Sequence, residues 1–229
     1  MKIDEIFGSE TPIRVGNHTK QQWRSSQHRA RLGSGSFGFA RDNPIDPHLV
    51  AKRNFAAGAL ERDAYYTYIK YTVDHNMAED NIHVPRVYSI QLLPTVTTDA
   101  NKNFPQTHFY RIDIEKLVQG HTLNPEEMKA AIDHLVNPDI IEGLKDWHYD
   151  AERYMQFAII EPIRQYLKGN AEYIIDEKLK EVLDVVIKLK HTAEPNLKFD
   201  LFSFDTHTGN YMFRRTSVGC QLVVTDPLC

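Results

Sequence analysis

The sequence contains little cysteine and no long apolar segment. Its 229 residues include only two cysteines, Cys220 and Cys229, and no Cys-x-x-Cys pair. A chain with so few cysteines has no disulfide framework, so we expect a reducing compartment. It has no run of about 18 apolar residues that would span a membrane. The first residues, Met-Lys-Ile-Asp-Glu, also lack the apolar core of a secretory signal. These absences predict a soluble cytoplasmic protein without a membrane partner.

Net positive charge is absent as well. The sequence has 27 Lys and Arg against 31 Asp and Glu, which gives a formal charge of −4. Without bulk positive charge, we expect no direct binding to nucleic acid or to an anionic membrane surface. The 11 histidines are scattered, with no His-Glu-x-x-His motif and no His/Cys cluster, so no zinc site is predicted.

What is present is the composition of an ordinary globular protein, with 41% hydrophobic and 25% charged residues. Residues 1–28 are polar and show little periodicity, which predicts an N-terminal arm, with a disordered lead-in as the alternative. After the arm, Asn-Pro and Asp-Pro steps at 43–44 and 46–47 favour a turn between two strands. The first half is predicted to contain a helix at 57–76 and strands at 29–41, 48–54, 86–93 and 107–117.

The second half of the chain has helical patterns. Asn124-Pro125-Glu126-Glu127 combines a capping residue, a proline at the first helical position and acidic residues in the first turn. Later, Leu179, Val182, Val186 and Leu189 lie along one helical face. Helices are predicted at 125–136, about 150–168 and about 176–191, and strands at 199–204, 210–215 and 221–225.

These elements predict an α+β fold with two lobes and a cleft between them. The arm covers residues 1–28, a β-rich N-terminal lobe covers 29–119, and a mostly helical C-terminal lobe covers 120–229. The boundary is expected near residues 119–124, where the pattern changes from strands to helices.

The first motif that could carry chemistry is Gly33-Ser34-Gly35-Ser36-Phe37-Gly38, a Gly-x-Gly-x-x-Gly sequence. A dinucleotide-binding fold needs a helix directly after such glycines. Phe39–Pro47 contains two prolines in turn contexts, so a helix there is not expected. The motif instead favours a β-hairpin whose backbone amides approach a nucleotide's phosphates, with a bare hairpin turn as the alternative.

A single lysine, Lys52, lies in the apolar strand Leu49–Lys52 that follows. Kinase-type sites use a strand lysine to hold the α- and β-phosphates and a helical acid to orient that lysine. Glu61 is the candidate partner and Asp63 its rival. Alternatively, Lys52 is a solvated residue at a sheet edge.

The strongest signal lies near the C-terminus, where Asp205 and Asn210 are five residues apart and Asp226 follows an apolar strand. Phosphoryl transfer needs a carboxylate to accept the hydroxyl proton, and it needs oxygen ligands for magnesium. These three side chains supply such groups. Asx-rich turns and an Asp at a strand end are the structural alternative.

The order of glycine loop, strand lysine, Asp-x-x-x-x-Asn and later Asp resembles the protein-kinase-like fold. Ser203–Phe213, with the later Thr225-Asp226-Pro227, is similar to the early Ser/Thr protein kinases of T7-like bacteriophages. Leu32–Phe39, the strand of Lys52 and Ala64–Thr67 fit that family too, and the resemblance spans roughly residues 30–228.

The resemblance implies roles for the C-terminal residues. Asp205 would be the catalytic base, and Asn210 and Asp226 would bind Mg²⁺. His207 stands where protein kinases have the catalytic-loop lysine, and would either contact the transferred phosphoryl group or brace the loop.

It also implies an ATP site in the first half. Lys52 would hold the phosphates and Gly33–Gly38 would cover them. Ile114–Leu117 would be the hinge, with backbone groups of Glu115 and Leu117 facing adenine. An ordinary edge strand is the alternative for this segment.

The family implies a Ser/Thr protein kinase that uses ATP and Mg²⁺ and phosphorylates proteins of the host bacterium in its cytoplasm. Ser203 replaces the His of His-Arg-Asp, and Pro227 follows Asp226 in place of Phe-Gly. With three residues after Asp226, we expect no activation segment and no C-terminal host shut-off region. Two alternatives stay open: a kinase of small molecules such as aminoglycosides or choline, favoured by His207, and a non-catalytic kinase-like inhibitor of a host factor.

Two segments are also candidates for phosphorylation. Arg214-Arg215-Thr216-Ser217 resembles a basic-directed site, because arginines can pair with an added phosphate. A phosphate on Ser34 or Ser36 would repel bound ATP. The alternatives are a solvated turn in the first case and a tight loop of small residues in the second.

Overall fold

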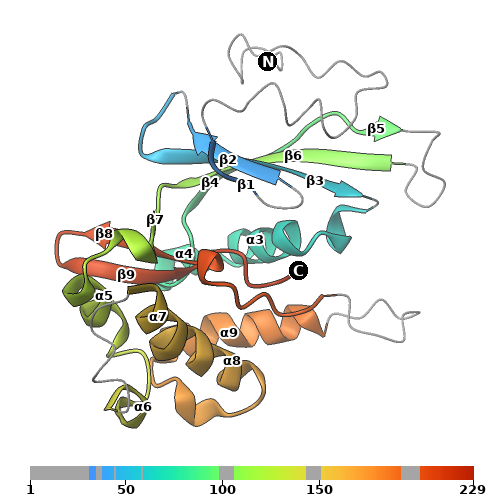
Figure 1. Ribbon diagram of the computed structural model, residues 1–229. Helices are drawn as coiled ribbons and strands as arrows, with labels where there is room; N and C mark the ends of the chain where they lie inside the picture. Colours follow the sequence, from blue (N-terminus) through green and yellow to red (C-terminus); the bar gives the residue numbers. More distant parts are fainter. Residues whose placement is uncertain are drawn as a thin grey trace. The chain divides into compact units, whose positions relative to one another are not determined.

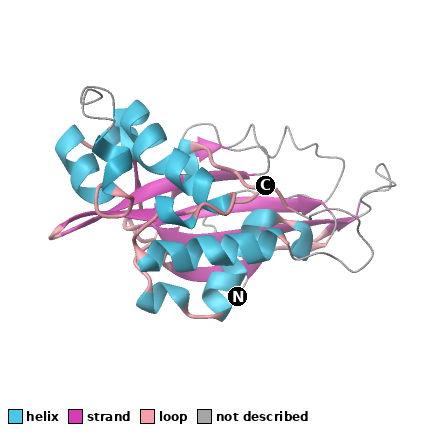
Figure 2. Cartoon of the chain, turned by 90° about the horizontal axis from the view of Figure 1, so that it is seen from below, coloured by secondary structure: helices cyan, strands magenta, loops and turns pink. Residues whose placement is uncertain are grey.

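The computed structural model describes residues 31–34, 38–43, 45–57, 59–97, 106–142, 151–191 and 202–229. The described chain forms an α+β fold of two compact units, which confirms the mixed class. The first unit contains the described residues up to Leu60 together with Tyr88–Glu115, and the second contains Glu61–Val87 and Lys116–Cys229. Strands make up most of the first unit, and helices make up most of the second. Figure 2 shows the strands in magenta and the helices in cyan. The predicted arm at 1–28 lies outside the described residues.

Six strands of the described part form the sheet of the first unit, in the order β1-β2-β3-β6-β4 with β5 paired to β6 (Figure 1). β1, β2, β3 and β6 are antiparallel neighbours. The predicted strand 29–41 is two strands, because the chain turns back within the glycine motif. The strands are β1 (Arg31–Ser34), β2 (Gly38–Asp42), β3 (Leu49–Ala57), β4 (Val87–Leu92), β5 (Val96–Thr97) and β6 (Gln106–Glu115).

One face of this sheet carries buried arginines. Arg53 and Arg111 are opposite each other in the β3–β6 pair and are 4% and 2% exposed. Arg111 binds Asp113 through Nη2 at 2.6 Å and Nε at 2.8 Å. Asp113 also accepts hydrogen bonds from Asn43 and Ser89. Burial, followed by the nearby Arg111, lowers the pKa of Arg53 to about 10.

The second unit combines helices with a three-stranded antiparallel sheet in the order β7-β8-β9. Its strands are β7 (Val118–Gln119), β8 (Tyr211–Thr216) and β9 (Gly219–Val224). Its α-helices are α3 (Ala64–Asp74), α4 (Met77–Asp80), α5 (Pro125–Ile132), α6 (Pro138–Glu142), α7 (Ala151–Met155), α8 (Glu161–Leu167) and α9 (Glu177–Lys190). Its short turns are η2 (Leu60–Arg62), η3 (Gly120–Thr122), η5 (Ala171–Tyr173) and η6 (Thr208–Asn210), with the π-helical η4 (Gln156–Ile160) joining α7 to α8.

The cap predicted at Asn124 and the apolar face predicted for the helix at 176–191 are confirmed. Asn124 accepts a hydrogen bond from the Glu127 amide, and the Glu127 carboxylate accepts one from the Asn124 amide, which completes a capping box. α5 ends at Ile132, before the predicted residue 136, because Val136 instead forms a β-bridge with Ile174. In α9 the predicted apolar face is buried, and Leu183 joins it.

The predicted helix 57–76 is wrong at its start. β3 continues to Ala57, and α3 begins only at Ala64, where Asp63 accepts a hydrogen bond from the Tyr66 amide. This short polar side chain ends the preceding turn and caps the new helix.

The predicted division at 119/120 also differs from the two units. Residues 61–87 were expected in the N-terminal lobe but belong to the second unit, and the chain passes into that unit for the last time after Glu115. The reason is tertiary: α3 packs against α9, and the buried Tyr68 hydroxyl donates to the Val224 carbonyl at 2.9 Å.

The last two predicted strands are confirmed as the β8–β9 hairpin, drawn red in Figure 1. Gly219 turns the hairpin with φ of +132°, a conformation that favours glycine. Of the strand predicted at 199–204, the described residues 202–204 form only a single bridge, between Phe204 and Leu228. Within the described residues, no helix is long and apolar enough to cross a membrane.

Candidate active site

The loop that contains Asp205 is held by the last residues of the chain. Ser203 exchanges two main-chain hydrogen bonds with Cys229, at 2.8 and 2.9 Å. The Asp205 amide then donates to the Pro227 carbonyl at 2.8 Å. The two segments therefore run antiparallel, and Asp205 is fixed beside the residue that follows Asp226.

Asn210 connects the same two segments. Its side-chain amide donates to the Asp205 carbonyl at 3.3 Å. Its main-chain carbonyl accepts two hydrogen bonds from Thr225, one from the amide and one from the hydroxyl, each at 2.8 Å. Because the amide nitrogen of Asn210 is the donor, its side-chain oxygen is the atom available as a ligand.

The structure thus brings Asp205, Asn210 and Asp226 together, and all three are half-buried. The buried ring of Tyr211 lies next to this group, because η6 leads directly into β8. Burial, and then the nearby Asp205 carboxylate, raises the pKa of Tyr211 above its ordinary value. The cluster supplies one carboxylate that can accept a proton and, from Asn210 and Asp226, two oxygen ligands.

These donors fit a magnesium site. Mg²⁺ prefers carboxylate and amide oxygens and usually keeps several waters, so one or two protein ligands are enough when a substrate phosphate supplies others. Among the described residues, no group of three or more His, Cys, Asp or Glu side chains forms a metal-binding cluster. Asn210 and Asp226 would therefore share the ion with phosphate oxygens and water.

His207 lies at the tip of the loop and is exposed. It caps η6, and its Nδ1 accepts a hydrogen bond from the Gly209 amide at 3.1 Å. A Cβ atom on Gly209 would lie only 3.2 Å from this Nδ1, so the contact favours glycine there. Two roles were predicted for His207, bracing the loop or contacting the phosphoryl group. The hydrogen bond from Gly209 is a contact of the first kind. With Nδ1 as acceptor, the neutral ring carries its proton on Nε2, the tautomer that can donate to an anion.

Arg164 was not predicted from the sequence. It lies on α8, and its Nε and Nη2 donate to the Thr206 hydroxyl at 3.2 and 3.1 Å. Its Nη1 pairs with Glu161 at 2.6 Å. Arg164 of α8 therefore holds Thr206, the residue after Asp205. The two residues are 42 positions apart, so no local sequence motif indicates the contact.

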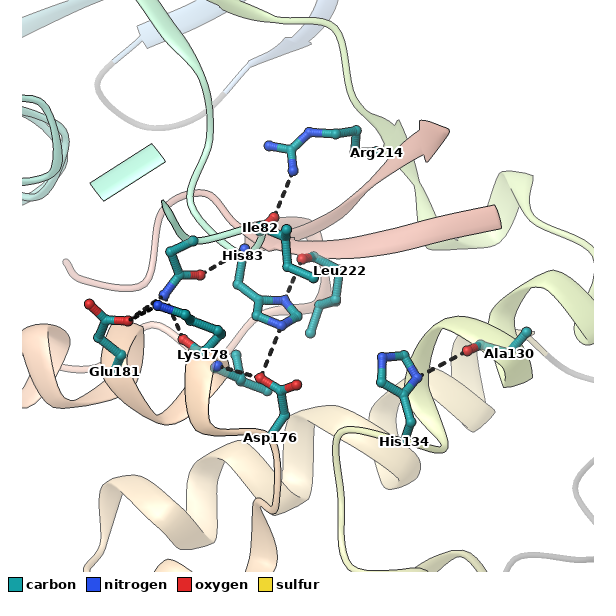
Figure 3. Close-up of polar contacts among 11 residues, drawn as sticks. Ile82, His83, Ala130, His134, Asp176, Lys178, Glu181, Arg214 and Leu222 are labelled. Carbon is teal, nitrogen blue, oxygen red and sulfur yellow. Dashed lines mark hydrogen bonds and ion pairs between the residues drawn. The ribbon is translucent and has the colours of Figure 1, made fainter. Parts of the chain in front are cut away.

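The outer edge of β9 is held by residues of the segment that begins with α3. The Val224 amide donates to the His83 carbonyl at 2.9 Å. His83 Nδ1 lies 2.8 Å from the Leu222 carbonyl, a contact that Figure 3 shows. His83 is 1% exposed, and its Nε2 lies 3.3 Å from Asp176, which caps α9. Burial lowers the pKa of His83 below its ordinary value.

The two neighbouring arginines of β8 have different environments. Arg214 is buried, and its guanidinium donates to the Ile82 carbonyl at 2.7 Å and the Val84 carbonyl at 3.0 Å. Arg215 is exposed and pairs with Glu127 at 3.7 Å. Thr216 donates to Gly219 across the turn. Of the two arginines in the predicted phosphorylation site, only Arg215 is exposed, because Arg214 is buried and its guanidinium binds main-chain carbonyls.

The remaining candidates lie in or beside the first unit. Lys52 is half-buried on β3, opposite Ala40 of β2 and Ile112 of β6. In the glycine motif, Gly33 and Ser34 end β1 and Gly38 begins β2. Gly35, Ser36 and Phe37 lie outside the described residues.

The predicted partners of Lys52 differ in what they do locally. Asp63 uses its carboxylate to cap α3, whereas Glu61 is exposed in η2 and offers its main-chain carbonyl to Thr67. Both acids belong to the second unit, and Lys52 belongs to the first. In the predicted hinge, Glu115 is the last residue of β6, and Leu117 lies in the link to β7.

Comparison of the chain with known proteins gave no match to a family model and no significant match to a curated protein. The interpretation of the site therefore depends on its own residues and their geometry.

Proposed function

We propose that the protein is an ATP-dependent Ser/Thr protein kinase of the phage type, with a bilobal kinase-like fold, that phosphorylates proteins of a host bacterium in its cytoplasm. One observation supports this most: the Asp205–Asn210 loop and the Thr225–Asp226 strand end are joined by hydrogen bonds into one cluster. A catalytic carboxylate and two oxygen ligands at one place are the groups that phosphoryl transfer requires.

In this proposal Asp205 accepts the proton of the substrate hydroxyl and aligns the oxygen with the phosphorus atom. Its main chain is held by Pro227 and by the side chain of Asn210, which fixes where the residue lies in the loop. Asn210 and Asp226 would hold Mg²⁺, which when bound offsets the negative charge of the ATP phosphates.

The first unit supplies the nucleotide-binding groups of the proposal. Lys52 would neutralise charge on the α- and β-phosphates, and the β1–β2 hairpin would cover them with main-chain amides. The backbone of Glu115 and Leu117 would face the adenine. Glu61 fits the role of acidic partner to Lys52 better than Asp63, because the Asp63 carboxylate already caps a helix.

A second candidate function is a small-molecule kinase. The observation that favours it is the exposed His207, whose Nε2 carries the proton and can donate to a phosphoryl oxygen. Both candidates use the same three C-terminal side chains, so they differ only in the acceptor.

The test is transfer of labelled γ-phosphate from ATP with Mg²⁺ present, using the full chain with and without a bacterial lysate. Asp205→Asn should reduce turnover by about 10²–10⁴-fold, because the general base is lost. The matched control is Asp80→Asn, which neutralises an exposed carboxylate on α4. Labelled proteins that depend on Asp205 support the protein kinase, and labelled small molecules support the second candidate. ATP binding without any transfer would refute both and favour a non-catalytic inhibitor.

A further inference from the structure

We propose that Tyr68 is a positioning residue for the metal ligand Asp226, acting through the strand end to which it is hydrogen-bonded. This inference rests on the proposed function, because it concerns the Mg²⁺ ligand of that site. It goes beyond that function by linking helix α3 to the geometry of the metal site.

The first step is how Asp226 is held. Each main-chain neighbour of Asp226 has a hydrogen-bonding partner in the described structure. Val224 accepts from Tyr68 and donates to His83, Thr225 donates twice to Asn210, and Pro227 accepts from Asp205. These contacts therefore restrain the main chain on both sides of Asp226.

Two of these hydrogen-bonding partners lie within the site itself, since Asn210 and Asp205 belong to the catalytic loop. The other two hold Val224 from outside it: His83 accepts from its amide, and Tyr68 of helix α3 donates to its carbonyl. The Tyr68 side chain is 0% exposed, and its hydroxyl lies 2.9 Å from the Val224 carbonyl. A buried hydroxyl of this kind needs a partner, and the carbonyl would lose its own partner if the hydroxyl were removed.

The Tyr68 hydroxyl is a neutral donor at all working pH values. Burial, followed by the nearby Tyr211 and Asp226, raises its pKa above the ordinary range. The Tyr68 hydroxyl therefore stays uncharged and keeps the proton that it donates to the Val224 carbonyl. Removing the Tyr68 hydroxyl would leave the strand end at Val224 less restrained. Metal binding would then have to restrict the motion of Asp226, which lowers the affinity for the ion.

The experiment compares Tyr68→Phe with a matched loss of a tyrosine hydroxyl elsewhere in the same unit. Tyr166 is also buried and donates to the exposed carboxylate of Asp184 at 2.8 Å, so Tyr166→Phe removes a tyrosine hydroxyl bond that does not involve the strand end. The probe is Mn²⁺, titrated into the full chain in the presence of adenylyl imidodiphosphate, an ATP analogue that is not hydrolysed. Protein-bound Mn²⁺ is followed by water-proton relaxation, and the unfolding temperature of each variant is recorded.

We expect Tyr68→Phe to weaken Mn²⁺ binding by about 10-fold, at the lower end of the effects seen when a residue supporting a metal ligand is lost. Tyr166→Phe should leave Mn²⁺ binding unchanged even where its unfolding temperature falls as much. In the γ-phosphate assay, Tyr68→Phe should need more Mg²⁺ for half-maximal rate and approach the wild-type kcat at saturating Mg²⁺.

The outcomes separate this inference from the proposed function. If Asp226→Asn abolishes Mn²⁺ binding but Tyr68→Phe binds Mn²⁺ like the wild type, the positioning role is wrong and the metal site stands. Equal weakening in Tyr68→Phe and Tyr166→Phe would show a general loss of stability and would also overturn the inference. If the wild type binds no Mn²⁺ that depends on Asp226, the proposed function and the inference both fail.

Discussion

Replacing Arg214 with Met should destabilise the protein strongly, while the same change at Arg215 should not. Met keeps the apolar stem of the arginine and removes the charged donors. At position 214 this leaves two main-chain carbonyls, those of Ile82 and Val84, without their guanidinium donor. Each hydrogen bond to a charged group contributes about 1.5–3 kcal/mol, so the expected loss is about 3–6 kcal/mol in the free energy of unfolding.

Arg215 is the matched control on the same strand. Its side chain is 55% exposed, and its nearest acid, Glu127, is 3.7 Å away. An exposed pair of this kind contributes about 0–1 kcal/mol. Arg215→Met should therefore lower the free energy of unfolding by about 1 kcal/mol at most, well below the loss expected for Arg214→Met.

The assay is urea denaturation followed by circular dichroism, with the slope of each transition compared between variants. Arg214→Lys is a useful third variant, because it keeps the charge and lacks the fork that reaches two carbonyls at once. We expect its stability to lie between those of the wild type and Arg214→Met. Equal stabilities of the 214 and 215 variants would refute the structural role assigned to Arg214.

Two further predictions concern stability. Burial lowers the folded-state pKa of His83 below its unfolded value of 6.5. The free energy of unfolding should therefore be fully present above pH 6.5 and fall as the pH is lowered toward the folded-state pKa, because the unfolded chain then binds more protons. His83→Gln should flatten this part of the pH profile in denaturation experiments. His48→Gln, at an exposed histidine, should leave the profile unchanged, and an identical slope in both variants would contradict the assignment. Asp63→Ala removes the cap of α3 and should cost about 1 kcal/mol in the same assay, whereas Asp74→Ala at the other end of α3 should cost less, and the reverse order would show that the cap does not matter.

The sequence predicted those elements whose signals are local. Asn124 and Glu127 cap a helix through contacts three residues apart, and α9 buries side chains that repeat with the helical period. The hairpin of β8 and β9 was predicted from two apolar strands around a turn. The loop from Asp205 to Asn210 was found for the same reason, because its key residues are only five apart.

The errors and omissions have a common physical cause, which is contact between residues distant in the chain. Tyr68 is an apolar-face residue by its spacing, and only the folded chain places its hydroxyl at Val224. Arg164 reaches Thr206 across 42 positions, and nothing near either residue in the sequence marks the pair. The start of the helix predicted at 57–76 was wrong because β3 pairs with β6 as far as Ala57, and sheet pairing overrides local helix preference.

The covered edge of β9 also limits how this protein can associate with other chains. β9 is the last strand of its sheet, and such a strand ordinarily offers unpaired amides and carbonyls to a strand from another molecule. Here Leu222 and Val224 direct main-chain groups away from β8, and His83 and Tyr68 bind them. The outer edge of the β8–β9 hairpin is thereby closed to strand addition at Leu222 and Val224, so the covering residues protect the second unit against edge-to-edge aggregation.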